Sequence, residues 1–268
     1  MARRDSQASG AMGERDAGRA ESKGVVVKPG RRHIVVAGTT LTGAFCQVDT
    51  VRGYRYLDVA GKVMNQYGAR FREMTVGLDG LRMWGSDDSF VEARASVKQL
   101  VAAFTLPPTF DLLEQEMNGY MRDVTGIFEV DHATRLGYRL QFVWPLDHDR
   151  TKDRQELLAN IMHVRALAGE HDVGSFNVAV RFEESDYGIS LSIATVSRTD
   201  TKTSPSDATT DLLTELPLSG VLFDVDFSSQ GKALPLLNLR PLLRFGRKWA
   251  ETRLAAVIAQ TVGEKVNA

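Results

Sequence analysis

The sequence has almost no cysteine, no long apolar run and no excess charge of either sign. Its single cysteine, Cys46, rules out an intrachain disulfide framework and any multi-cysteine zinc site. No apolar run reaches the ~18 residues from which a membrane-spanning helix is predicted. The N-terminus mixes both charge signs and lacks the apolar core of a secretory signal. We therefore expect a cytoplasmic protein with no membrane span.

The charge balance also argues against one class of partner. The chain has 33 Lys and Arg against 34 Asp and Glu, a formal net charge of -1. Such a chain has no global field that would attract nucleic acid or an anionic membrane. Its 268 residues, 43% hydrophobic and 25% charged, are ordinary for a globular protein. The length allows one large domain or two modest ones.

Composition and spacing divide the chain into a tail and two halves. Residues 1–24 contain almost no large apolar side chains, so they cannot offset their own ordering entropy, and we predict a disordered tail. Residues 25–145 form a first α+β half that ends at a proline. Residues 146–268 form a second half that ends in a basic helix, and a solvated loop is expected at 197–210.

Hydrophobic periodicity predicts helices and strands in a recurring order. We expect helices over 54–68, 110–124 (with Thr109 as its cap), 157–169 and 241–262, and strands over 33–37, 45–48, 71–76, 81–84, 93–101, 136–144, 176–183, 189–193 and 220–227. The order helix, strand, strand, strand, helix occurs twice, over 54–124 and 151–262. Consecutive hairpins favour antiparallel pairing. The prediction is an α+β fold with helices packed on one face of the antiparallel sheet or sheets, and a duplicated α-β-β-β-α unit is one interpretation of it.

Two aspartates near the end of the chain form the first candidate site. The stretch Gly220–Phe227 contains Asp224 and Asp226, and it resembles the first motif of the haloacid-dehalogenase-like phosphatases. That resemblance implies Asp224 as nucleophile and Asp226 as general acid, with Mg²⁺ between them. However, the Gly-Thr of the motif is replaced by Phe227-Ser228, and few residues follow it. The interpretation we prefer has both carboxylates on the solvent face of an antiparallel strand, whose apolar residues at alternate positions point inward.

Two arginines form the second candidate site. Arg135 and Arg139 share one face of the strand that contains them, opposite Leu136, Tyr138 and Leu140. They are placed to bind a carboxylate or phosphate of a ligand. Alternatively, they pair with Asp224 and Asp226 on a neighbouring strand, because opposite charges across strands are mildly favourable. We prefer the pairing.

The third candidate site is a basic stripe on the last predicted helix. Arg240, Arg244, Arg247 and Lys248 follow one another at helical spacing beside Phe245 and Trp249. The stripe is suited to phosphate, an anionic surface or an acidic partner. The alternative is that these cations are ordinary solvent-exposed side chains with no binding role, on a helix whose aromatic side chains belong to the core.

No other catalytic pattern is present. The chain contains no P-loop, no dinucleotide fingerprint, no nucleophile elbow and no zinc-site spacing among its five histidines. We therefore predict no cofactor and no metal.

The Arg135–Arg139 strand, the Gly220–Asp226 strand and the helix through Phe245 and Trp249 together resemble a sporadically distributed bacterial protein family without assigned activity. The resemblance covers residues 70–260 and implies a bacterial cytoplasmic setting and no known catalytic residues.

These observations predict a non-enzymatic interaction or assembly module, oligomeric or bound to a protein partner. One alternative is a ligand-binding protein or a Mg²⁺-dependent phosphate-ester hydrolase that uses Asp224 and Asp226. A second alternative is nucleic-acid binding through the basic helix.

Overall fold

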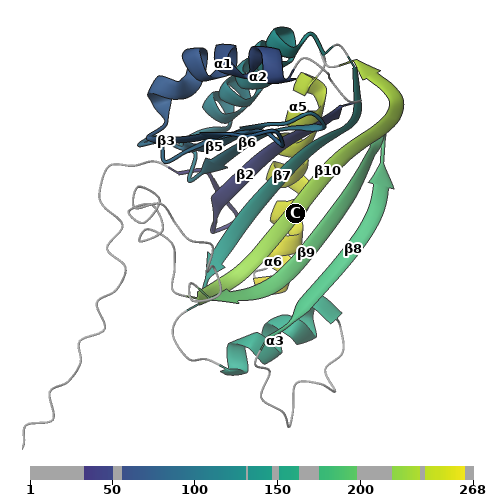
Figure 1. Ribbon diagram of the computed structural model, residues 1–268. Helices are drawn as coiled ribbons and strands as arrows, with labels where there is room; N and C mark the ends of the chain where they lie inside the picture. The colour runs from purple at the N-terminus through teal and green to yellow at the C-terminus, as the bar shows by residue number, and fades with distance from the viewer. Residues whose placement is uncertain are drawn as a thin grey trace, which may run out of the picture.

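A single open antiparallel sheet of ten strands dominates the computed structural model, and helices lie on one of its faces (Figure 1). The structure describes residues 33–50, 56–130, 132–146, 151–162, 175–197, 219–235 and 239–262. The predicted α+β class, with helices on one face of an antiparallel sheet, is confirmed. None of the described helices is long and apolar enough to cross a membrane.

The first part of the chain contains six of the described strands. In chain order its elements are β1 (Val35–Val36), β2 (Thr39–Thr50), α1 (Tyr56–Tyr67), the 3-10 turn η1 (Gly68–Arg70), β3 (Glu73–Val76), β4 (Leu81–Trp84), β5 (Phe90–Ala95), β6 (Gln99–Thr105) and α2 (Phe110–Phe128).

The second part contains the remaining strands. Its elements are β7 (His132–Pro145), α3 (Thr151–Met162), β8 (Asn177–Glu184), β9 (Tyr187–Ser197), β10 (Ser219–Pro235), α5 (Leu239–Trp249), the π-helical turn η5 (Ala250–Leu254) and α6 (Ala255–Val262).

The strands that flank the helices pair in the same way in both parts of the chain. The strand order is β3-β4-β5-β6-β2-β7-β10-β9-β8, with β1 beside β2. In each part the strand that precedes the first helix pairs with the strand that precedes the last helix, β2 with β6 and β7 with β10. β2 and β7 then pair with each other at the centre. This topology agrees with a duplicated unit, although the first part has four strands between its helices instead of the expected three.

The extra strand arises where one long strand was expected. Residues 93–101 do not form a continuous strand: β5 ends at Ala95 and β6 begins at Gln99. The Ser96 hydroxyl accepts hydrogen bonds from the backbone N–H groups of Lys98 and Gln99, at 3.3 and 3.0 Å. A serine that bonds to the backbone ahead of it stabilises a turn, which explains the break.

The helices cover the face that carries the apolar side chains of the central strands. Val221, Phe223, Val225 and Phe227 of β10 are fully buried, as predicted. Thr109 caps α2, because its hydroxyl accepts a hydrogen bond from the Leu112 N–H at 3.2 Å. The opposite side of the sheet, which we call the open face, carries the polar residues of the same strands. The tail at 1–24 and nearly all of the loop predicted at 197–210 lie outside the described residues.

Candidate functional site

The predicted arginines and aspartates meet on the open face, where β7 and β10 pair. Arg135 Nη2 lies 2.9 Å from Asp226 Oδ2. Arg139 binds Asp224 through both Nε, at 2.7 Å, and Nη2. In the register of the two strands Asp226 is opposite Arg139, so each arginine reaches a carboxylate diagonally. The preferred interpretation of these four residues, pairing across strands, is confirmed.

The polar network continues toward the first part of the sheet. Asp49 of β2 accepts hydrogen bonds from the side-chain amides of Gln47, at 2.8 Å, and Gln99, at 3.2 Å. Its carboxylate also lies 4.0 Å from Arg135. A hollow of about 600 Å³ lies over this network, lined by Phe45, Gln47, Val101, Arg135, Gly137, Arg139, Asn177, Ser190, Ser192, Ala194, Leu222, Asp224 and Asp226.

Burial and the ion pairs between arginine and aspartate shift the pKa values of side chains in this network. Burial raises the pKa of Asp226 above its ordinary value, although Arg135 and Arg139 act in the opposite direction. The hydrogen bond from Arg139 to Asp224 raises the pKa of the arginine. The guanidinium groups occupy the oxygens that the phosphatase interpretation assigns to Mg²⁺. Among the described residues, no group of three or more His, Cys, Asp or Glu side chains has an arrangement that holds a metal ion.

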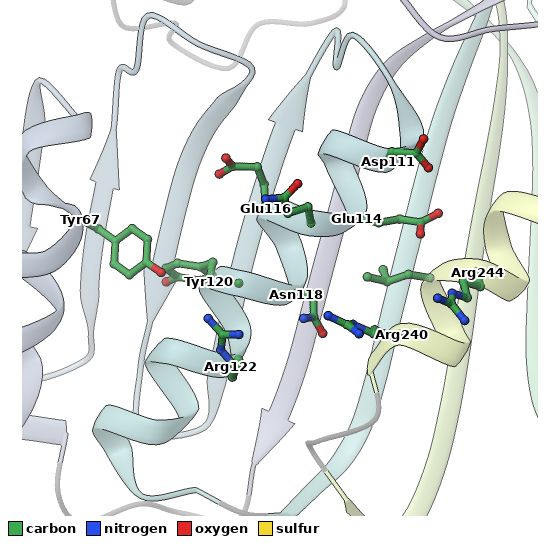
Figure 2. A pocket seen from close by; sticks show the side chains of 12 residues that line it. Tyr67, Asp111, Glu114, Glu116, Asn118, Tyr120, Arg122, Arg240 and Arg244 are labelled. Atoms are coloured by element: carbon green, nitrogen blue, oxygen red, sulfur yellow. The ribbon is translucent and has the colours of Figure 1, made fainter.

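A second hollow lies on the helix side of the molecule, between α2 and α5, and we call it the α2–α5 groove (Figure 2). Its volume is also about 600 Å³. The end of α1 closes it with Tyr67. The full lining is Tyr67, Asp111, Glu114, Gln115, Glu116, Asn118, Gly119, Tyr120, Arg122, Arg240, Leu243 and Arg244.

Arg247 joins the two helices at one end of this groove. It binds Asp111 of α2, lies 3.1 Å from Glu251 and 3.9 Å from Glu114, and packs over the ring of Phe110 at 5.4 Å. These contacts hold α5 against α2. Arg247, although it belongs to the basic stripe, therefore serves as a structural contact between the two helices.

The other residues of the basic stripe are placed differently. Arg240 and Arg244 are exposed and line the groove, whereas Lys248 is exposed outside it. Within the part of the chain that the structure describes, neither Arg240 nor Arg244 has an ion pair or a side-chain hydrogen bond. Figure 2 shows the Arg240 side chain extending from α5 to the vicinity of Asn118 of α2, and the Arg244 side chain lying close to α5.

The carboxylates of the groove have unequal surroundings. Glu116 lies 2.5 Å from Arg70, and Asp111 binds Arg247. Glu114 is more buried, and burial raises its pKa. Its Oε1 atom has no hydrogen-bond partner in the described structure. Arg244 lowers the pKa of Glu114 by electrostatic attraction, against the larger effect of burial, but no ion pair joins the two among the described residues.

A third feature is the edge of the sheet at β8. Within the described residues, β8 pairs with β9 alone. Val180 and Phe182 point to the helix side of this strand but remain 51% and 36% exposed. At the opposite edge, β3 exposes Val76 to a similar extent, 52%. Exposed apolar side chains on an edge strand are a typical site for pairing with another chain.

Sequence reasoning missed several residues of these sites. Gln47 and Asp49 alternate with the buried Cys46 and Val48, so the pattern of β2 contained a signal for the open face. The groove residues of α1 and α2 gave no comparable signal, because their proximity to α5 depends on tertiary packing.

No family model matches the chain, and no curated protein matches it.

Proposed function

We propose that the protein is a non-enzymatic assembly module that forms a homodimer by antiparallel pairing of β8 with β8 of a second copy. The setting that we propose is a bacterial cytoplasmic complex. The observation that supports this proposal is the edge at β8, where Val180 is 51% exposed and Phe182 is still 36% exposed although its ring packs against Trp249 of α5. The neighbouring Ile189, Leu191 and Ile193 of β9 are buried on that same face.

The sequence of β8 suits pairing with itself. If Val180 lies opposite its own copy, Val178 faces Phe182 on the helix side and Ala179 faces Arg181 on the open face. Asn177 then faces Glu183. This register places apolar side chains together and sets no like charges directly opposite each other. A register centred on Arg181 would place two arginines face to face, which is destabilising.

Strand addition gives both affinity and specificity to such an interface. Main-chain hydrogen bonds form along the eight residues of β8. The apolar side chains lose their contact with water when a second copy covers them. The result is one continuous sheet that crosses the two-fold axis, with the helices of both copies on the same side.

The alternatives receive less support from the contacts. For a hydrolase, Asp224 and Asp226 would have to exchange their arginine partners for a metal ion. For nucleic-acid binding, Arg247 is already bound to acidic residues of the protein. Both alternatives stay predictions. The first is tested by Mg²⁺-dependent turnover of phosphate esters and its loss in Asp224→Asn, and the second by steep salt dependence of DNA affinity.

Light scattering coupled to size-exclusion chromatography tests the homodimer. We expect twice the chain mass for the wild type, and monomers for Val180→Arg and for Val180→Glu, because each places like charges opposite each other at the two-fold axis. An equimolar mixture of the two variants is expected to restore the dimer. Val76→Arg is the matched control, since Val76 has nearly the same exposure on the other edge strand, and it is expected to remain dimeric.

Thermal unfolding of each variant separates loss of pairing from loss of folding. A wild type that stays monomeric at micromolar to millimolar concentration would overturn the proposal. A dimer that persists unchanged in Val180→Arg would show that the interface lies elsewhere and would equally overturn it.

A further inference from the structure

The α2–α5 groove combines a cavity with two arginines that have no ion pair or side-chain hydrogen bond among the described residues. Arg240 and Arg244 are one helical turn apart on α5, so their side chains emerge close together on the same face. Neither has an ion pair among the described residues, whereas Asp111 and Glu116 across the groove each bind a different arginine. Two adjacent guanidinium groups repel each other, and Arg244 is attracted to Glu114 without forming an ion pair with it among the described residues. An anion between them would remove that repulsion.

We propose that the α2–α5 groove is a binding site for a small organic phosphate, held by Arg240 and Arg244. A phosphoryl group carries up to two negative charges and offers several acceptor oxygens. Guanidinium groups donate paired hydrogen bonds to such oxygens in a matching geometry. Asn118 lies beside Arg240 in the groove and supplies a further polar contact for the ligand (Figure 2).

The shape and lining of the groove indicate the size and class of the ligand. A volume of about 600 Å³ is within the range of cavities that bind small molecules. The lining beyond the two arginines is mostly polar, with Gln115, Asn118 and Tyr67, so it suits a hydrophilic molecule and not a lipid tail.

A compact ligand fits this charge pattern better than a polymer does. Asp111, Glu114 and Glu116 lie on the α2 side of the groove. A nucleic-acid backbone along the groove would bring repeated phosphates close to these carboxylates. A single phosphoryl group at the α5 wall avoids them. This inference is independent of the proposed homodimer, which uses the sheet edge at β8.

Isothermal titration calorimetry on the full chain tests the proposal with three probes at matched ionic strength: inorganic phosphate, phenyl phosphate and benzoate. We expect saturable binding of both phosphates and weaker binding of benzoate, which has one charge and two oxygens. Arg240→Ala and Arg244→Ala are each expected to weaken phenyl phosphate binding by about tenfold or more, the loss typical of one charge-assisted hydrogen bond.

Two kinds of variant locate the ligand. Lys248→Ala and Arg253→Ala remove exposed cations of the same helical region that do not line the groove, and we expect them to bind phenyl phosphate like the wild type. Gly119→Leu is expected to block the groove. A Cβ at Gly119 meets no atom within 4 Å, so a side chain can start there without a backbone clash, and leucine favours the helix.

The outcomes that would overturn the proposal are distinct. One is the absence of saturable binding of either phosphate at millimolar concentration. Another is an equal loss of affinity in the arginine variants and in the Lys248 and Arg253 controls, which would indicate non-specific attraction. The last is full phenyl phosphate binding by a correctly folded Gly119→Leu protein, which would place the ligand outside the groove.

Discussion

At the scale of single residues, Gly246 determines how closely α5 approaches the sheet. A Cβ built at this position would lie 2.6 and 2.8 Å from ring atoms of Tyr138 and 3.1 Å from Phe227. Both rings are fully buried, so they have no free space into which to move. The absence of a side chain at Gly246 therefore allows the helix to lie directly on the two aromatic residues.

We expect Gly246→Ala to destabilise the protein by about 1–3 kcal/mol, because overpacking of the core outweighs the gain in helix propensity. Chemical denaturation monitored by circular dichroism measures this difference. Gly61→Ala is the matched control: Gly61 is an exposed glycine of α1, and a Cβ added there would meet no atom within 4 Å. The control is expected to be as stable as the wild type or up to about 1 kcal/mol more stable. Equal behaviour of the two variants would contradict this account.

Alternation along single strands was enough to predict which side chains of β10 point inward. Val221 to Phe227 follow a period of two, and the carboxylates of Asp224 and Asp226 lie on the other side as expected. The role of Gly246 was not predictable. A glycine within a helical pattern gives no indication of the residues it will contact, because that depends on how the helix docks on the sheet.

At the scale of elements, the two ion pairs between β7 and β10 differ in the burial of the aspartate and in the number of hydrogen bonds that it accepts. Asp224 has a side chain that is only 13% exposed, and Arg139 binds it through two nitrogen atoms. Asp226 is more exposed, and burial nevertheless raises its pKa, so its charged form is disfavoured in the folded protein. Removal of a partner should therefore have different consequences in the two pairs.

We expect Arg139→Ala to destabilise the protein by about 1–2 kcal/mol, because it leaves the nearly buried Asp224 carboxylate without its partner. The double variant Arg139→Ala/Asp224→Asn is expected to recover most of this loss. Urea denaturation at pH 7 measures both changes. A double variant less stable than Arg139→Ala alone would contradict the argument.

Asp226→Asn removes the charge of the second aspartate of β10, and we compare its effect on stability with that of Arg139→Ala. Because the pKa of Asp226 is raised in the folded state, its ionisation lowers stability as the pH rises above the carboxyl's unfolded pKa. The asparagine variant should thus match or slightly exceed the wild type at pH 7. The difference should shrink as the pH falls toward 4, where the aspartic acid becomes neutral.

Elements were predicted best where their periodicity was long and continuous. The strands at 176–183 and 189–193 and the helix at 110–124 correspond to β8, β9 and α2. The expected strand at 93–101 failed because Ala93 to Val101 alternate as a strand would, while the hydrogen bonds of Ser96 turn the chain between β5 and β6. Local side-chain bonding to the backbone overrode the alternation.

At the scale of the whole molecule, the sheet is continuous across the boundary predicted between residues 145 and 146. β2 and β7 pair from Thr40 with Val143 to Thr50 with Ala133, so the central strand of each part is hydrogen-bonded to the other. On the helix side, Arg247 of α5 binds Asp111 of α2. Sequence patterns identified the two similar series of elements, but they gave no information on the pairing that joins them.

We therefore expect the two parts to unfold together. Amide hydrogen exchange at low denaturant, followed by mass spectrometry of peptides, should give the same opening free energy for the slowest amides of β6 and of β10. The physical reason is that unfolding of either part would remove the partner of β2 or β7 and expose buried side chains of the remaining strand, such as Cys46 or Tyr138. Two separate free energies would instead indicate domains that open independently at the 145/146 boundary. A shared value would mean that the paired central strands join the two parts of the chain into one cooperative unit.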